Sequence, residues 1–301
     1  IERCVDAFVE EDGTIKTYKF EDFNLDNIRN GRALMLLHRV TGKKKYYLAA
    51  LNLRNQLKEQ PRTSEGSFWH KKIYPSQVWL DGLYMAMPFF AEWASVFNEP
   101  GAYNDIAVQF TDIEKHARDP KTGLIYHGWD ESKAQQWANK ETGNSPNFWA
   151  RAMGWYGMAL VDVLDYFPKE QTSRPELIAV MNRFAEAIAK SQDKKTGLWW
   201  QVMDKPDSTG NYPEASASSM FVYALAKASR MGYIDSKYET VALKGYEGIK
   251  KQFLETDNEG FLHLNGTVSV GGLGGKPYRD GSYAYYLSEK VIQDDPKGMG
   301  A

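Results

Sequence analysis

The sequence predicts an all-α protein in which inner and outer helices alternate around a ring. Pro75, Pro146, Pro213 and Pro277 each open a long stretch of apolar and small residues, at intervals of 64 to 71 residues. Between them lie amphipathic segments with apolar residues three and four positions apart. Patterns typical of strands are nearly absent. Because regular self-similarity is typical of helical repeats, we expect one domain spanning residues 1–301.

The expected inner helices are rich in apolar and small residues, whereas the outer helices carry charged faces. The inner helices are placed at Asp26–Val40, Pro75–Val96, Pro146–Tyr166, Pro213–Arg230 and Pro277–Ile292. The outer helices are placed at Lys45–Gln60, Tyr103–His116, Pro175–Lys190 and Tyr238–Phe253, and Ile1–Val9 is the end of another. This alternation suggests a toroid. A closed ring of six pairs would need an inner helix before Ile1 and an outer helix after Ala301.

A short repeated motif supports the same phase of the repeat. Asp119–Leu124 reads DPKTGL and Asp193–Leu198 reads DKKTGL, with a looser form at Asp257–Phe261. Each follows an expected outer helix, where glycine supplies a tight reversal of the chain. We expect short hairpins at Gly197–Met203 and Gly260–Leu264.

Composition excludes several classes of function. With 37 basic and 39 acidic residues, the formal net charge of -2 offers no field for a phosphate backbone, so we expect no nucleic-acid partner. The single cysteine, Cys4, cannot form an internal disulfide, and five scattered histidines give no Cys/His zinc pattern, so we expect no structural metal. No apolar run approaches the length of a membrane span, and no signal peptide is visible. Compartment and oligomeric state stay open.

Aspartate 81 is the strongest candidate for a catalytic acid. It is the one charged residue in a long apolar stretch, VWLDGLYMAM, on an expected inner helix. A carboxyl group there loses hydration, which favours the protonated form and suits general acid catalysis near neutral pH. The alternative is a buried aspartate that caps a neighbouring helix or pairs with an arginine.

Arginine 151 and three tryptophans suggest a carbohydrate pocket. Arg151 is isolated in the apolar segment NFWARAMGWY, at nearly the same level of its helix as Asp81. Its planar guanidinium could bind a substrate carboxylate through two hydrogen bonds, or it could simply pair with Asp81. Trp79, Trp149 and Trp155 flank the two charges and offer flat faces on which sugar rings stack, although such aromatics equally serve as core.

Three further polar residues are candidates for the same site. His127 follows the first repeated motif and could reach over the mouth of the ring, although a loop histidine is more often solvated. His70 lies just ahead of the Asp81 helix. Asp26 opens an inner helix, where its default role is N-capping and its alternative role is that of a second active-site carboxylate.

Four motifs resemble those of glycoside hydrolase family 105, the unsaturated rhamnogalacturonyl hydrolases, which are related to the unsaturated glucuronyl hydrolases of family 88. The motifs are WLDGLYM at 79–85, HGWD at 127–130, SPNFWARAMGW at 145–155 and DPKG at 295–298. The resemblance runs from about Asp26 to the last residue. It implies an (α/α)6 barrel without cofactor or metal, incomplete here at its first inner and last outer helix.

The resemblance also implies the roles of the candidate residues. Asp81 matches the principal acid/base and Asp26 the second active-site aspartate. The matching substrate-binding positions are Trp79, His127, Trp149, Arg151 and Trp155, with His70 close by. The implied reaction hydrates the vinyl ether double bond of a 4,5-unsaturated uronic acid and so removes it from pectin oligosaccharides left by lyases. The first expectation for the substrate is unsaturated galacturonate linked to rhamnose.

Three alternatives remain at this point. An unsaturated glucuronyl hydrolase would act by the same chemistry on glycosaminoglycan or ulvan fragments. A toroidal sugar isomerase or epimerase would use histidines on inner helices, and the helices of Asp81 and Arg151 contain none. A noncatalytic carbohydrate-binding protein would give Asp81 no reason to be ionisable.

Overall fold

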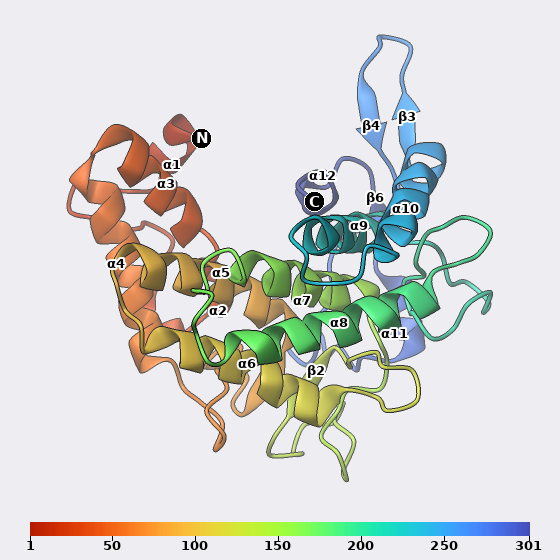
Figure 1. The fold of residues 1–301 in the computed structure, drawn as a ribbon, viewed down its shortest axis with the longest axis horizontal. Coiled ribbons are helices and arrows are strands. Elements are labelled where there is room, and N and C mark those ends of the chain that lie inside the picture. Colours follow the sequence, from red (N-terminus) through yellow and green to blue (C-terminus); the bar gives the residue numbers. More distant parts are fainter.

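The computed structural model describes residues 1–301 and is mostly helical, which confirms the expected class (Figure 1). The long helices are α3 (Gly31–Thr41), α4 (Lys44–Glu59), α5 (Leu80–Val96), α6 (Ala102–Ala117), α7 (Ala150–Val163), α8 (Arg174–Ser191), α9 (Ala215–Arg230) and α10 (Tyr238–Gln252). The short helical elements are α1 (Glu2–Asp6), η1 (Phe20–Asp22), α2 (Leu25–Ile28), α11 (Tyr283–Ser288) and α12 (Pro296–Met299). No helix combines the length and apolar content needed to cross a bilayer.

Inner and outer helices alternate as the sequence predicts. Helix α7 packs between α5 and α9, while α6 packs on α5, α8 on α6 and α7, and α10 on α9. One ion-pair network links four of the expected inner helices. Arg32 of α3 contacts Glu92 of α5 at 3.1 Å and Asp162 of α7 at 2.9 Å, and Lys227 of α9 contacts Asp162 at 2.8 Å. The charged ends of these four helices therefore meet.

The strands form three small antiparallel pairs. β1 (Gln77–Trp79) pairs with β2 (Gly128–Asp130), β3 (Leu254–Thr256) with β4 (Leu262–Leu264), and β5 (Thr267–Val268) with β6 (Val291–Ile292). The β3–β4 pair is the hairpin expected at Gly260–Leu264 and projects from the molecule in Figure 1. The β1–β2 pair matters most for the site, because it places Trp79 opposite Gly128, next to His127.

The repeated DxKTGL motif forms the same turn twice. Asp119 accepts hydrogen bonds from the backbone and hydroxyl of Thr122, and Asp193 accepts the same pair from Thr196. The following glycines have φ angles of 75° and 78°, which side chains rarely adopt. Each turn reverses the chain after an outer helix, α6 or α8.

Two elements expected from the sequence differ in the structure. The inner helix expected at Pro277–Ile292 is wrong, since only Tyr283–Ser288 is helical and Val291–Ile292 is a strand. Gly281, at a φ of 66°, precedes this helix and Ser282 caps it, which delays its start. The hairpin expected at Gly197–Met203 is reduced to isolated antiparallel bridges, of Trp200 with Pro213 and of Val202 with Trp149.

The first inner helix is also divided. Asp26–Val40 forms α2 and α3, which are separated by Arg29 and Asn30. Asp26 does not cap α2, because Asn24 is the N-cap and its side chain accepts a hydrogen bond from the Asp26 amide. The carboxylate of Asp26 is thereby left for other contacts.

Candidate functional site

Asp81 lies in the first turn of α5, directly after β1. Its side chain is 14% exposed, so it is neither turned outward nor sealed in the core. Its Oδ2 lies 3.0 Å from Nε2 of His127, but the two atoms are not aligned as a hydrogen bond and Oδ2 has no other partner. The alternative pairing of Asp81 with Arg151 is absent, and the buried neighbour of Asp81 is a histidine.

His127 is fixed between Asp81 and Tyr286. It is fully buried rather than solvated, and its backbone oxygen accepts a hydrogen bond from Leu80 at 3.1 Å. Its Nδ1 lies 2.7 Å from the hydroxyl of Tyr286, whose pKa is raised well above its usual value by burial. Because this phenol keeps its proton, it can donate to Nδ1, and a neutral His127 then carries its proton on Nε2. Nε2 is the atom that faces Asp81.

Asp26, His70 and Lys71 form a second polar group beside Asp81. Asp26 Oδ2 lies 2.6 Å from Lys71 Nζ, and Asp26 Oδ1 lies 3.5 Å from His70 Nε2. Burial lowers the pKa of His70 to about 4, so His70 is neutral at pH 7. Burial alone would raise the pKa of Asp26, but the neighbouring positive charges outweigh it and hold the pKa below its usual value. Lys71 and Arg279 are the cations that do so at neutral pH.

The three tryptophans differ in what covers them. Trp79 is 4% exposed, and both His70 and Tyr74 stack on its indole, with ring centres 4.4 and 4.9 Å away. Trp149 is 1% exposed and packs against His127 and Tyr286. Trp155 is half-buried and stacks on Tyr84 at 4.7 Å. Rings of this chain therefore cover Trp79 and Trp149, and Trp155 keeps the most open surface.

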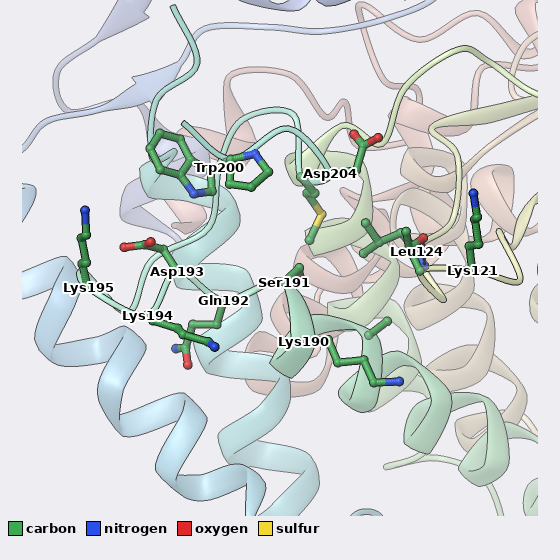
Figure 2. A pocket seen from close by; sticks show the side chains of 14 residues that line it. Lys121, Leu124, Lys190, Ser191, Gln192, Asp193, Lys194, Lys195, Trp200 and Asp204 are labelled. Atoms are coloured by element: carbon green, nitrogen blue, oxygen red, sulfur yellow. Dashed lines mark hydrogen bonds between the residues drawn. The ribbon is translucent and has the colours of Figure 1, made fainter. Parts of the chain in front are cut away.

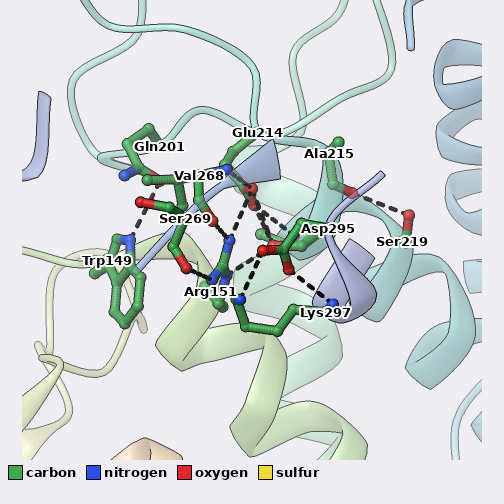
Figure 3. A network of polar contacts seen from close by, with 12 residues as sticks. Trp149, Arg151, Gln201, Glu214, Ala215, Ser219, Val268, Ser269, Asp295 and Lys297 are labelled. Atoms are coloured by element: carbon green, nitrogen blue, oxygen red, sulfur yellow. Dashed lines mark hydrogen bonds and ion pairs between the residues drawn. The ribbon is translucent and has the colours of Figure 1, made fainter. Parts of the chain in front are cut away.

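Arg151 points into a buried polar network rather than toward Asp81 (Figure 3). Its Nε donates to Ser216 at 2.8 Å, its Nη1 donates to the backbone oxygen of Ser269 at 3.4 Å, and its Nη2 donates to the backbone oxygen of Val268. Nη2 also lies 3.4 Å from Glu214, which is fully buried and caps α9. All three nitrogens are thus occupied by this chain, and the guanidinium is not free for a bidentate contact with a substrate.

The structure brings most of the expected site residues into one cluster. Asp81 contacts His127, and His127 packs on both Trp79 and Trp149. His70 stacks on Trp79 and approaches Asp26. Arg151 approaches this cluster only through Trp149, whose ring centre lies 5.7 Å from the guanidinium.

Sequence reasoning missed Tyr286 and Glu214, the partners of His127 and Arg151. Tyr286 is 159 residues from His127 in the sequence, and no local pattern connects the two. The sequence does carry a signal for Glu214. It is an acidic residue at the start of an apolar helix, directly after Pro213, where a buried carboxylate needs a cation.

Two sizeable cavities lie away from this cluster. One, of about 540 Å³, is bordered by both DxKTGL turns and by lysines that include Lys121, Lys190, Lys194 and Lys195 (Figure 2). The other, of about 590 Å³, lies near His116 and Asn144. Neither contains Asp81. A cavity just large enough for one water molecule lies beside His70, Trp79 and Gly82, and Nδ1 of His70 is buried without a partner.

The amino-acid sequence matches a known family of glycoside hydrolases. The model of Glycosyl Hydrolase Family 88 matches residues 1–301. Protein Atu3128 of Agrobacterium fabrum is 41% identical over 222 residues, which are 72% of this chain and 94% of that protein. Unsaturated rhamnogalacturonyl hydrolase YesR of Bacillus subtilis is 30% identical over 217 residues, which are 69% of this chain and 59% of YesR.

Solved structures give the same result. A glycoside hydrolase from family 105 of C. acetobutylicum superposes with a TM-score of 0.97 and 47% identity, covering 99% of this chain and 83% of the other. An unsaturated glucuronyl hydrolase from Bacillus sp. GL1, responsible for the degradation of glycosaminoglycan, superposes with a TM-score of 0.62 and 13% identity, covering 90% and 74%. At that identity the second likeness concerns the fold alone.

Proposed function

The chain belongs to glycosyl hydrolase family 88 and, within it, to family 105, and from this premise we propose that it removes an unsaturated galacturonate from rhamnose in pectin fragments produced by lyases. The protein acts as one (α/α)6-barrel domain over residues 1–301. The alternation of α5 to α10 and the likeness to family 105 support this architecture.

The substrate preference rests on the leaving sugar. Galacturonate and glucuronate differ only at C4, and C4 is trigonal in the 4,5-unsaturated ring, so both give the same unsaturated residue. Discrimination must therefore come from the linkage and the neighbouring sugar. YesR, named for rhamnogalacturonyl hydrolysis, is 30% identical to this chain, whereas the glucuronyl hydrolase from Bacillus sp. GL1 is 13% identical. This difference favours rhamnose.

Asp81 supplies the proton that starts the reaction. The protonated carboxyl group gives its proton to C4, the electrons of the double bond form the new C–H bond, and positive charge develops at C5, where the ring oxygen stabilises it. Asp81 suits this role because its side chain is partly exposed in the first turn of α5, so a substrate can reach it both as the acid that gives the proton and as the carboxylate that takes one back. Both forms are needed within one turnover.

Water completes the reaction. It adds at C5 and gives a proton to the Asp81 carboxylate, which restores the acid. The hemiketal then opens to a ketone at C5, and the hemiacetal left at C1 releases the neighbouring sugar. Tyr286 donates to Nδ1 of His127, which leaves the proton of His127 on Nε2. This N–H faces the Asp81 carboxylate during the part of the reaction in which Asp81 is ionised. Asp26, kept ionised by Lys71, is placed to orient the substrate or the water.

Binding roles follow from exposure. Trp155 offers an open face for a sugar ring, and Trp79, Trp149 and His70 form the wall against which the site is built. Because the donors of Arg151 are occupied, we assign Arg151 to holding Trp149 in place. Lys71, whose side chain is 21% exposed, is the cation nearest Asp26 that remains able to reach a uronate carboxylate.

The contact between partly exposed Asp81 and His127 carries this proposal, and substrate comparison tests it. We expect the protein to bleach the ultraviolet absorbance of unsaturated galacturonyl-rhamnose at least about tenfold faster than that of unsaturated disaccharides from glycosaminoglycan or ulvan. Initial rates at equal, low substrate concentration give the ratio of kcat/KM values. A preference for the glycosaminoglycan disaccharide would contradict the rhamnose assignment, and no bleaching of any substrate would contradict the activity.

A further inference from the structure

A cluster of three potential metal ligands lies outside the Asp81 site. Glu65 stands in the turn between Arg62 and Phe68, while Asp112 and His116 lie one turn apart on α6. One ligand atom from each of Glu65, Asp112 and His116 lies within 4.8 Å of the other two. His116 Nε2 lies 2.8 Å from Glu65 Oε1 and 3.4 Å from Asp112 Oδ1. The segment 63–68 is thus held against α6 through this cluster.

Asp112 points a buried, unsatisfied oxygen into the cluster. Its side chain is 4% exposed, and its Oδ1 has no hydrogen-bond partner. Its Oδ2 accepts from the hydroxyl of Ser67. A buried acceptor without a donor costs free energy. A cation at Oδ1 would supply the missing partner.

The surroundings hold the three ligands in orientation. The Ser67 hydroxyl fixes the other oxygen of Asp112, and the Trp129 ring stacks on His116 with centres 4.0 Å apart and planes 7° apart. Lys115 contacts Oε2 of Glu65 and so leaves Oε1 directed at His116. Such supporting contacts orient metal ligands in proteins and raise their affinity.

We propose that Glu65 Oε1, Asp112 Oδ1 and His116 Nε2 bind a divalent cation such as Zn²⁺ or Mn²⁺. One imidazole and two carboxylates are the ligand types that such cations accept, with water in the remaining positions. His116 must lose its Nε2 proton on binding, and the cation then replaces that proton between the two carboxylates. The site takes no part in the sugar chemistry.

The cation would act by fixing a segment that leads into the Asp81 site. Two residues after Phe68 comes His70, whose backbone pairs with Gln77 at the start of β1. Trp129, the ring that covers His116, lies in β2 and pairs with Val78. A bound cation would therefore stabilise the native arrangement of β1 and β2 from outside.

Calorimetric titration of the chelator-treated full chain with Zn²⁺, and separately with Mn²⁺, tests the proposal. We expect one equivalent to bind, and saturating metal to raise the melting temperature by about 2 °C. Asp112→Asn and His116→Gln should each weaken binding at least about tenfold and abolish the thermal shift. Glu65→Gln changes an exposed turn, so it keeps the test valid if the Asp112 variant fails to fold.

His263→Gln is the matched control. His263 also lies between two carboxylates, but Asp294 meets its Nδ1 at 2.6 Å and Asp257 meets its Nε2 at 3.2 Å, on opposite sides of the ring, so the three side chains do not face one cation. Metal binding should be unchanged in this variant. The proposal is overturned if the wild-type chain binds neither metal, or if Glu65→Gln and His116→Gln bind it as tightly as the wild type.

Discussion

Asp81→Asn is expected to lower kcat about a thousandfold while substrate binding stays within about threefold. The amide has nearly the shape of the carboxyl group, so the packing against His127 and the start of α5 remain. It cannot protonate C4 at neutral pH, and it cannot accept the proton from water afterwards. Steady-state bleaching measures the rate, and calorimetry with the slowly turning variant measures binding.

Asp105→Asn is the control for this variant. It makes the same change on α6, where Asp105 pairs with Arg62 away from the candidate site. Its kcat should equal that of the wild type. If Asp81→Asn keeps more than a tenth of the wild-type kcat, Asp81 is not the acid, and the assignment of the mechanism to this cluster is wrong.

Arg151→Ala is expected to destabilise the protein by about 3 to 5 kcal/mol. Removing the guanidinium leaves Glu214 as a fully buried carboxylate without its cation and deprives Ser216 and two backbone oxygens of their donor. Breaking a buried pair from one side is costly because the remaining charge stays desolvated. Urea denaturation followed by circular dichroism gives the free energy of unfolding.

Lys190→Ala provides the comparison on the surface. Lys190 pairs with Glu186 one turn away on α8, and both side chains are exposed. Its loss should cost no more than about 1 kcal/mol. A free-energy change for Arg151→Ala as small as that of Lys190→Ala would show that the guanidinium is free to serve the substrate, as the sequence first suggested.

The helical architecture was predictable because it depends on local sequence patterns. Apolar periodicity located α4 to α10 to within a few residues, and the turns at Asp119 and Asp193 repeat because their aspartate, threonine and glycine each have a local role. The prediction of one helix from Pro277 to Ile292 was wrong, because the apolar residues of this stretch pack against distant partners. Tyr286, for example, is buried against His127 and Trp149.

The candidate site was predictable where a charge stands alone among apolar residues. Asp81 and Arg151 were both found in this way, and each lies beside a buried polar side chain, His127 and Glu214 respectively. Their partners could not be assigned, because pairing depends on which distant segments meet. Arg151 was expected to face Asp81 but meets Glu214, which comes from the next inner helix. The sequence also could not show that Tyr74 stacks on Trp79 and Tyr286 on Trp149, because these pairs join distant segments.

Hydrolysis of unsaturated galacturonyl-rhamnose in heavy water tests the central claim most directly. We expect release of rhamnose together with a keto-uronate that carries one deuterium at C4, observed by nuclear magnetic resonance. The deuterium marks protonation of the double bond at C4 by an acid that exchanges with solvent, which is the role that we assign to Asp81. Release of rhamnose with an intact double bond and no deuterium at C4 would mean that the glycosidic bond is cleaved directly, and it would contradict the hydration mechanism.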